Sequence, residues 1–462
     1  MVGPITCSTP KPAARRGVIR TLVILVVAGG FALAAQAQKA GLALDIDKAL
    51  ALARQESAQL AVLDARRAKA EGARESSLQA FLPSVSAGAA WWRTDASVLD
   101  EVPVPELGVP PSIVLRDLGP VEAYTSNVQV EQPLVNIDAW HARAQAGHLV
   151  ESATLALRRG ERELDVAVIE AYYGVRTLQA REAAVDAALA AARRALRVAE
   201  AAHEEGLVSG LDVSRARAGV ASRQSQSARV RGATAEAEAG LRELLGLDAA
   251  TRLVLTDDVP PPPPVGSGID WSSGVLEERY DVRAGSEALA AAESGVDKAQ
   301  AAYLPRLNLL GRYQWADSDG PFLDNLDGWL VAVSVRWTPF TGMAQAGALD
   351  QARAERLEAR ARLTALRRQA AREVQALHAR WDSAFAAWRE GEAAVAAAET
   401  AQEDAERRYV EGVGTLTDLL QAQASLLQAR VERTDDSYRA LVAARRHALA
   451  TGPGSSAPGY LP

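Results

Sequence analysis

The chain has 462 residues, a formal net charge of −7 and one cysteine, Cys7. This acidic balance removes the electrostatic basis for nucleic-acid binding, so we expect no nucleic-acid partner. Only 5% of the residues are aromatic. Because alanine dominates the apolar share, the composition favours long, closely packed helices over one large globular core.

Residues 1–37 have the pattern of a secretory signal peptide. Four basic residues lie among the first twenty, an apolar run follows to Ala35, and the small-residue sequence Ala35-Gln36-Ala37 ends the segment. An uncleaved anchor helix is the alternative, but the short apolar core favours cleavage. Cleavage would remove Cys7 and leave 47 basic against 58 acidic residues, a net charge of −11. No later stretch of about eighteen apolar residues exists, so any other membrane crossing must use strands.

The rest of the chain is an internal duplication. A shift of 206 residues places Pro133 on Pro339 and Asp212 on Asp418, and a shift of 222 places Pro83 on Pro305. We therefore expect a first repeat (38–247), a Pro/Gly-rich linker (248–274), a second repeat (275–452) and a flexible C-terminal tail (453–462). The 16-residue difference between the shifts indicates a loop insertion around the Pro-rich stretch 103–111.

Each repeat contains one very long segment without proline. There are 126 such residues after Pro133 and 113 after Pro339. Apolar residues from Leu363 to Trp388 recur at steps of three and four, which is typical of helical-bundle packing. Glycines interrupt each segment once, so we expect long helical hairpins at 134–247 and 341–452. The arm before Gly206 would be about 110 Å long.

A period of two identifies strands ahead of each hairpin. We expect strand pairs at 84–94 with 121–132 and at 306–316 with 328–338, each preceded by a helix. One face of every strand is apolar and the other polar, and each has about the length of a tilted membrane strand. Aromatic residues at strand positions form a candidate membrane-interface belt, namely Trp91, Trp92, Tyr124, Tyr313, Trp315, Trp329 and Trp337.

Two amphipathic hairpins on a soluble core are the alternative for these strands. Four strands cannot close a barrel, and an open edge in lipid would leave backbone groups unpaired. If the strands lie in outer-membrane lipid, several copies of the chain must therefore share one barrel.

The sequence resembles the TolC-like outer-membrane efflux protein family (outer membrane factors) over nearly all of residues 42–452. The resemblance rests on Phe81-Leu82-Pro83, on Tyr303-Leu304-Pro305, on the stretch 408–423 (RYVEGVGTLTDLLQAQ) and on its first-half version, 205–213. It implies an all-α-dominated fold with a membrane β-barrel part. In that fold a homotrimer shares one twelve-stranded barrel, and long helical hairpins form a periplasmic α-barrel.

The same resemblance implies a passive exit duct in the outer membrane of a Gram-negative-type cell, serving tripartite efflux or type I secretion. It implies no enzyme activity and no cofactor. The partners implied are a periplasmic adaptor (membrane fusion) protein and an inner-membrane transporter. The glycine turns at Gly206, Gly210, Gly412 and Gly414 would be the hairpin tips where the adaptor docks.

Acidic residues at the tips line the narrowest part of the lumen in this family, and the matching positions are Asp212 and Asp418. Each aspartate follows a glycine turn, so a helix-capping role is an equal alternative. The chain departs from some members in having Gln421 in place of a second aspartate and Gly414 in place of an arginine latch.

The sequence contains no recognisable catalytic or metal motif. The five histidines lack metal-ligand spacing, and no phosphate loop or nucleophile elbow is found. The alternative to a duct is a periplasmic coiled-coil scaffold, which the helices alone would support. The four amphipathic strands argue against that alternative. The cargo and the class of the partner transporter are not fixed by the sequence.

Overall fold

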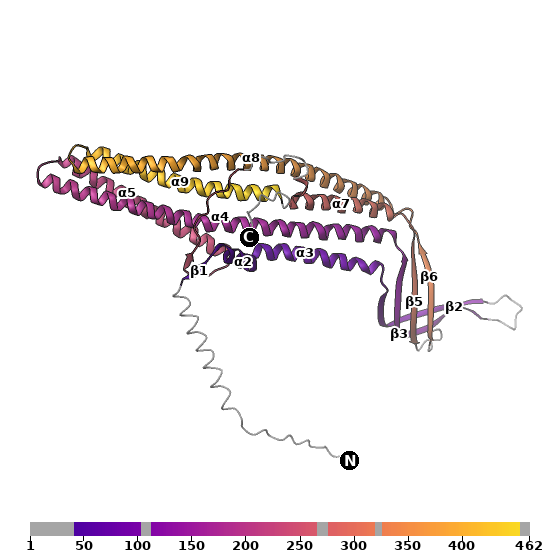
Figure 1. Cartoon of the computed structure of the whole chain (residues 1–462). Helices are drawn as coiled ribbons and strands as arrows, with labels where there is room; N and C mark the ends of the chain where they lie inside the picture. The colour runs from indigo at the N-terminus through magenta and orange to yellow at the C-terminus, as the bar shows by residue number, and fades with distance from the viewer. Residues whose placement is uncertain (1–40, 103–111, 266–275, 319–325, 453–462) are drawn as a thin grey trace, which may run out of the picture.

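The computed structural model describes residues 41–102, 112–265, 276–318 and 326–452. The proposed signal peptide (1–37), the Pro-rich stretch 103–111, the last part of the expected linker and the tail 453–462 lie outside the described residues. Within these ranges, long helices form one elongated body and a sheet bends away from one end of it (Figure 1).

Four helices build two antiparallel hairpins that lie side by side. The first consists of α4 (Ile137–Glu204) and α5 (Gly210–Leu244), the second of α8 (Ala344–Val410) and α9 (Leu416–Thr451). The longer arms contain 68 and 67 residues, so each is about 100 Å long. No proline interrupts either arm, and alanine allows the helices to approach closely. The long hairpins expected from the sequence are confirmed.

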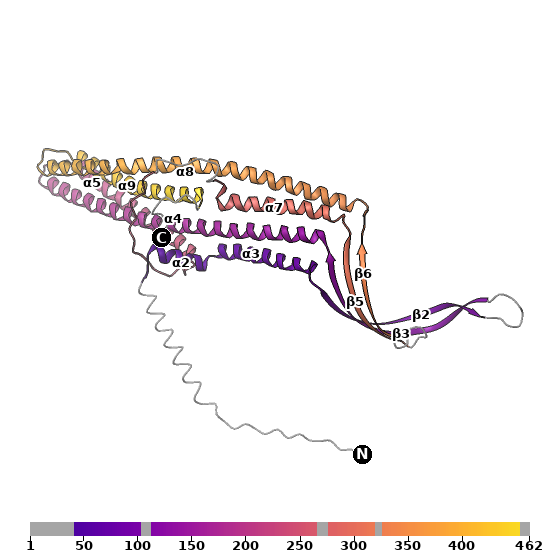
Figure 2. The same ribbon diagram turned by 45° about the vertical axis from the view of Figure 1, so that its right-hand side comes forward.

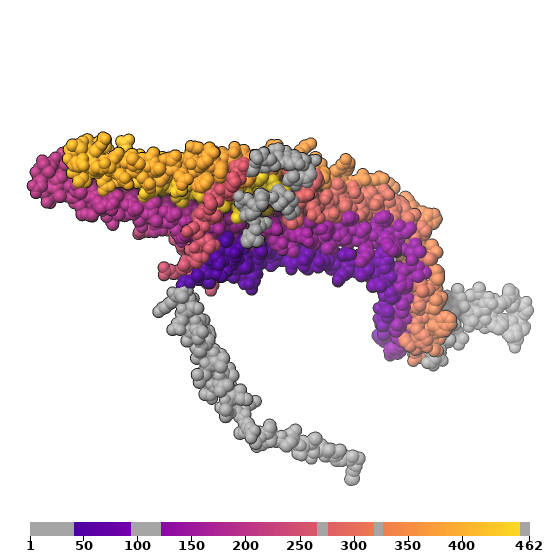
Figure 3. All heavy atoms as spheres, viewed as in Figure 1, coloured from indigo at the N-terminus to yellow at the C-terminus, as the bar shows by residue number. Residues whose placement is uncertain are grey.

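Shorter helices complete the wall beside the sheet. α2 (Ile46–Glu56) and α3 (Ala58–Ser76) precede the first strand, and α7 (Tyr280–Ala301) precedes the third. α3 packs on α4, α4 on α7 and α7 on α8; toward the tips the order is α5, α4, α9, α8. The body is thus one helix layer, with α3 and α5 at one lateral edge and α8 at the other (Figure 3).

The four long strands form one antiparallel sheet in the order β2-β3-β5-β6 (Figure 2). They are β2 (Ser84–Val102), β3 (Ser112–Val135), β5 (Arg306–Ser318) and β6 (Leu326–Arg336). β2 and β3 extend well past the expected ranges because their pairing resumes after an irregularity between Asp95 and Ser97. The sheet order β2-β3-β5-β6 repeats the helix order α3-α4-α7-α8, so each strand continues the wall.

The element bounds follow the two sequence shifts. α4 and α8 end at Glu204 and Val410, 206 residues apart, and β2 and β5 begin at Ser84 and Arg306, 222 residues apart. The two repeats therefore have the same local structure, and the tips of the two hairpins are equivalent sites.

The first part of the expected linker is not a linker. β4 (Leu253–Leu255) pairs in parallel with β1 (Leu42–Leu44). The pair joins the largest buried cluster, where the Tyr172 hydroxyl donates to the Leu44 carbonyl at 2.9 Å and accepts from the Asp257 amide at 3.1 Å. Three-residue strands carry too little periodicity to be recognised in a sequence.

Residues 259–265, here called the strap, follow β4 and lead to the second hairpin. The indole Nε1 of Trp381 on α8 donates to the Pro263 carbonyl at 3.3 Å, and Val265 packs beside Trp381. The strap thus ties the core of the first repeat to the second.

No described helix combines the length and the low charge content of a membrane-crossing helix.

Candidate functional sites: the hairpin tips and the sheet

Both hairpin tips turn at a glycine with left-handed backbone. Gly206 has φ +70° and Gly412 has φ +74°, values that other residues adopt only with strain. In each tip the amide after this glycine donates back to the helix, from Leu207 to the Ala202 carbonyl at 2.8 Å and from Val413 to the Arg408 carbonyl at 3.0 Å. The tips therefore share one Schellman-type ending.

The two aspartates occupy matching positions in matching capping boxes. Asp212 accepts from the Ser209 hydroxyl at 2.7 Å, and the Ser209 hydroxyl oxygen accepts from the Asp212 amide at 3.3 Å. In the second tip, Asp418 accepts from the Thr415 hydroxyl at 2.7 Å, and the Thr415 hydroxyl oxygen accepts from the Asp418 amide at 3.2 Å. The helix caps themselves are Ser209 and Thr415, and the aspartates are the third helical residues. The bond from Ser209 lowers the pKa of Asp212 below its usual range, with a smaller contribution from Arg215.

The other two tip glycines have different roles. Gly210 is the first residue of α5, and a Cβ there would meet nothing closer than 3.8 Å. Gly414 lies in the turn before α9, where a Cβ would be only 2.9 Å from the Arg408 Cβ and 3.1 Å from the Tyr409 amide nitrogen. Among the four tip glycines, Gly414 alone lies where a neighbouring side chain and backbone leave no room for a Cβ.

A buried contact that the sequence analysis missed joins the two tips. Tyr409 of α8 packs with Leu416 against Ala199 and Ala216 of the first hairpin. Its hydroxyl is buried and has no hydrogen-bond partner among the residues that the structure describes. Burial raises the pKa of Tyr409, and the nearby Asp212 carboxylate raises it further. The contact links the second hairpin to an aspartate of the first.

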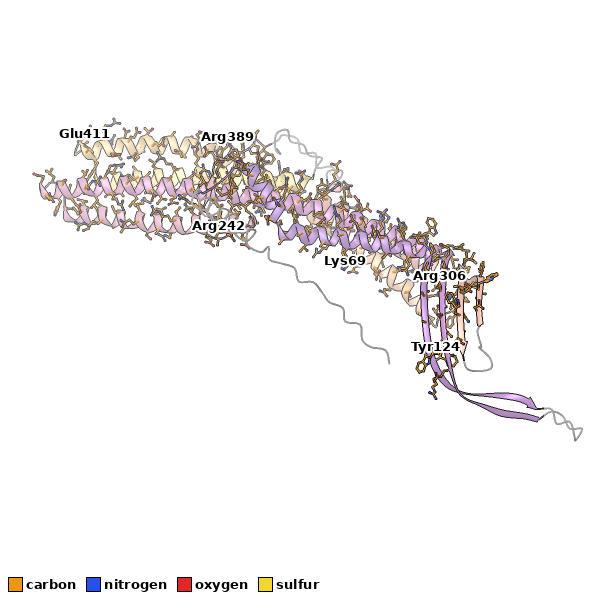
Figure 4. The ribbon with its side chains drawn as sticks, turned by 90° about the horizontal axis from the view of Figure 1, so that it is seen from below. Lys69, Tyr124, Arg242, Arg306, Arg389 and Glu411 are labelled. Atoms are coloured by element: carbon orange, nitrogen blue, oxygen red, sulfur yellow. The ribbon has the colours of Figure 1, made fainter. Side chains whose placement is uncertain are left out.

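Apolar side chains are exposed at both tips. Leu207 is 78% exposed and Val413 is 76% exposed, and Leu211 and Val410 lie beside them with large exposed fractions. Glu411 ends the second hairpin arm far from the sheet, as Figure 4 shows. Isolated exposed apolar residues are normal, but a group of four at two neighbouring hairpin ends, two on each, is typical of a docking surface.

The sheet has one apolar and one polar face, and the register extends each face over all four strands. Trp91 lies opposite Tyr124, Val128 opposite Tyr313, and Leu309 opposite Val333 on the same face. On the other face Gln129 accepts from Arg312 at 2.9 Å. The alternation expected from the sequence is therefore confirmed and continuous.

The aromatic residues lie mainly on the apolar face. Tyr313 lies opposite Trp329. Trp315 lies with Trp91 and Tyr124 near the end of the sheet that is far from the helices, where Figure 4 labels Tyr124. Trp92 differs, because the residue after Trp91 points to the polar face. Trp337 follows the last residue of β6 near the helices, where its indole donates to the Tyr303 carbonyl at 3.1 Å. Trp92 therefore lies on the face opposite to Trp91, and its membrane-interface role stays a prediction.

Within the described part of the chain, both outer strands of the sheet are unpaired on one side, because β2 and β6 end the strand order. At the lateral edge where β2 is the outer strand, the outer helices are α3 and α5. At the opposite edge, β6 is the outer strand and α8 is the outer helix. Sheet and helix layer therefore have matching open edges.

The described residues contain no group of three or more His, Cys, Asp or Glu side chains that could hold a metal. His148 Nδ1 lies 2.7 Å from Glu287 and His203 Nδ1 lies 2.9 Å from the Val208 carbonyl oxygen, so these histidines have structural partners.

An elongated helical-hairpin body with an open amphipathic sheet is the architecture of a membrane channel subunit. The chain matches the outer membrane efflux protein family over residues 49–247 and 271–452, and it belongs to that family. The sheet, the duplicated hairpins and the tip turns all lie within these ranges.

Individual relatives agree with this assignment. Protein CyaE of Bordetella pertussis is 30% identical over 268 residues, which are 57% of this chain and 56% of that protein, so the match spans little more than half of each. The crystal structure of the outer membrane protein VceC of Vibrio cholerae has a TM-score of 0.72 at 23% identity, covering 88% of this chain and 96% of VceC. The Campylobacter jejuni CmeC outer membrane channel gives 0.75 at 16% identity, covering 88% and 85%.

Proposed function

We propose that this chain is one subunit of a homotrimeric outer-membrane duct through which an inner-membrane transporter and a periplasmic adaptor export their cargo. The observation that carries the proposal is the continuous apolar face across a four-stranded sheet whose two edge strands are open. Open edges in lipid leave backbone donors and acceptors unpaired, so a membrane sheet of this size requires further copies. Three chains would give about twelve strands, within the size range of membrane barrels.

The helices support the same assembly. Pairing β2 of one copy with β6 of the next would bring the α3/α5 edge of one wall against the α8 edge of another. A tube of helices about 100 Å long would then continue the barrel toward the adaptor. The alternative, a periplasmic coiled-coil scaffold, does not explain the apolar face of the sheet.

Adjacent residues of β6 test which face meets lipid. Val333 is exposed on the apolar face, and Ser334 is the next residue and points to the polar face. An arginine on the lipid side of a membrane strand costs about 2–4 kcal/mol near the midplane, whereas the polar face already carries Arg312 and Arg336.

We expect Val333→Arg to reduce the amount of assembled protein in outer membranes strongly, and Ser334→Arg to leave it nearly unchanged. Immunoblotting of unheated outer-membrane fractions measures both. Equal tolerance of the two substitutions would argue for a soluble location of the sheet and for the scaffold.

We further propose that Asp212 and Asp418 form a cation-preferring constriction at the tips. The support is their matched placement at both hairpin ends, which threefold symmetry would multiply into a ring of carboxylates. Their capping role is compatible with this, because each capping box uses one carboxylate oxygen, Oδ2.

Asp418→Asn separates the two roles, since the amide oxygen can still accept from Thr415 while the charge is lost. We expect reduced cation selectivity in planar bilayers with unchanged stability. Thr415→Ala is the matched control, which weakens the cap by about 1 kcal/mol and keeps the charge. Unchanged selectivity in Asp418→Asn would show that the aspartates only cap helices.

The exposed apolar tip residues support docking of the adaptor at this end. Leu207 and Val413 lie directly after the left-handed glycines, so a partner would meet them first. The cargo is not specified by any described site, and no enzymatic step is proposed.

A further inference from the structure

Two histidines from different helices face each other beside Trp381, the residue that binds the strap. His447 on α9 is 6% exposed, and its ring centroid is 5.5 Å from that of His378 on α8. Trp381 packs against both rings, with centroids 5.3 Å from His447 and 6.4 Å from His378. The same Trp381 holds the strap through its bond to the Pro263 carbonyl. The histidine pair and the attachment point of the strap are therefore one cluster.

One nitrogen of the buried His447 ring, Nε2, is inaccessible to solvent and has no hydrogen-bond partner among the described residues. Buried polar atoms of this kind are rare, and each is a candidate for a conditional role. Burial lowers the pKa of His447 to about 4, and the charge of His378 also lowers it. The native packing thus accepts only the neutral ring.

Among the described residues, no carboxylate is paired with the His447 ring, and the influences that act on it are burial and His378. The strap contains only valine and proline. On α9 the preceding Arg446 is engaged with Glu170 of α4. Immediately before α7, the guanidinium of Arg279 is engaged with Asp281 and Glu373.

On α8 the ionisable group that acts on His447 is His378 itself. Asp382 follows His378 by one turn, but its side chain is exposed and therefore screened by solvent. Protonation of His447 would consequently add a charge to a buried pocket in which burial and His378 both disfavour it.

We propose that His378 and His447 form a proton-operated latch for the strap. While His447 is neutral, the pocket is packed and the strap is held on Trp381. When the compartment is acidified and His447 becomes charged, its unfavourable interaction with His378 and the hydration of its ring drive the two rings apart, and Trp381 releases the Pro263 carbonyl. Because the strap runs from β4 in the core of the first repeat, release loosens the tie between the two halves. This latch is a property of the chain and does not depend on the proposed duct.

A fluorescence experiment on the full chain in detergent tests the latch directly. Cys7→Ser removes the natural thiol, and Pro264→Cys introduces one at an exposed strap position next to Pro263. A bimane label at this position is quenched by Trp381 while the strap is bound. We expect the emission to rise by about twofold as the pH falls from about 7.5 to about 4, and to return on neutralisation.

Four variants control the interpretation. Trp381→Phe should give bright emission at every pH, which identifies the quencher. His447→Leu fills the pocket with a group that does not titrate and should stay quenched at low pH; His378→Gln should lose at least about half of the response. His141→Gln, a histidine outside the pocket, should keep the full response.

An emission that does not change with pH in the labelled parent would overturn the proposal. An equal rise in the parent and in His447→Leu would do the same, because carboxylates elsewhere would then be responsible. If His447→Leu does not fold, His378→Gln still decides, since an unaltered response in that variant contradicts a two-ring latch.

Discussion

One guanidinium in the middle of the molecule holds three helices together. Arg279, which is 2% exposed, donates to the Ala450 carbonyl at the end of α9 at 2.7 Å. It also forms two bonds to Asp281 at the start of α7, at 3.0 and 2.7 Å, and one to Glu373 of α8 at 2.9 Å. Burial would raise the pKa of Asp281, but the bonds and charge of Arg279 outweigh burial and lower it.

Arg279→Ala removes the cation and leaves both carboxylates without their partner. Breaking a buried pair in this way destabilises by about 3–5 kcal/mol. The Glu373 side chain is 38% exposed, so solvent screens part of the loss and we take the lower end, about 3 kcal/mol. Because each 1.36 kcal/mol is about a factor of ten, local opening at the start of α7 should become roughly 100-fold more frequent.

Hydrogen exchange measured by mass spectrometry reports this opening. Amides of residues 282–286 should exchange about 100-fold faster in Arg279→Ala, while amides near the tips stay unchanged. Arg283→Ala is the matched control, since Arg283 is an exposed residue one turn along α7. Combining Arg279→Leu with Asp281→Asn and Glu373→Gln should restore much of the protection. Exchange in Arg279→Ala within about threefold of the parent would refute the argument.

Three further predictions concern the tips and the histidine pocket. Gly414→Ala should displace the second tip turn and lower the thermal midpoint, because its Cβ would meet Arg408 at 2.9 Å, whereas Gly210→Ala should be neutral; equal midpoints would contradict the close approach. Tyr409→Phe should leave stability equal or slightly higher, because it removes a buried hydroxyl without a partner in the described part of the chain; a clear loss in urea unfolding would reveal a partner. Since the pKa of His447 is about 4 in the fold and about 6.5 when unfolded, the unfolded state binds the extra proton between these values. Stability should therefore fall by about 3 kcal/mol per chain as the pH drops through that window, and His447→Leu should lack this component of the urea-unfolding profile.

The sequence predicted the parts of the fold that rest on repetition. The helical arms have many turns of apolar periodicity and no proline, and the strands alternate over enough residues to define their faces. Identical residues at a fixed distance in the two repeats, such as Gly206 and Gly412, identify equivalent turns. The tip aspartates could be found in the same way, although the caps proved to be Ser209 and Thr415.

What the sequence could not supply are contacts between segments far apart in the chain. β1 and β4 are too short to show a pattern, and the strap crosses from one repeat to the other with no local signal. Tyr409 and His447 look like ordinary helix residues until α4, α8 and α9 are packed together. Trp92 was grouped with Trp91 by residue type, although strand alternation places it on the opposite face.

The most direct test of the duct is to purify the chain from outer membranes in mild detergent, determine the mass of the unheated complex, and record single channels in a planar bilayer. A trimer that gives small, discrete conductances is the result we predict. A monomer or dimer without channel activity would contradict the account and would favour a periplasmic coiled-coil scaffold.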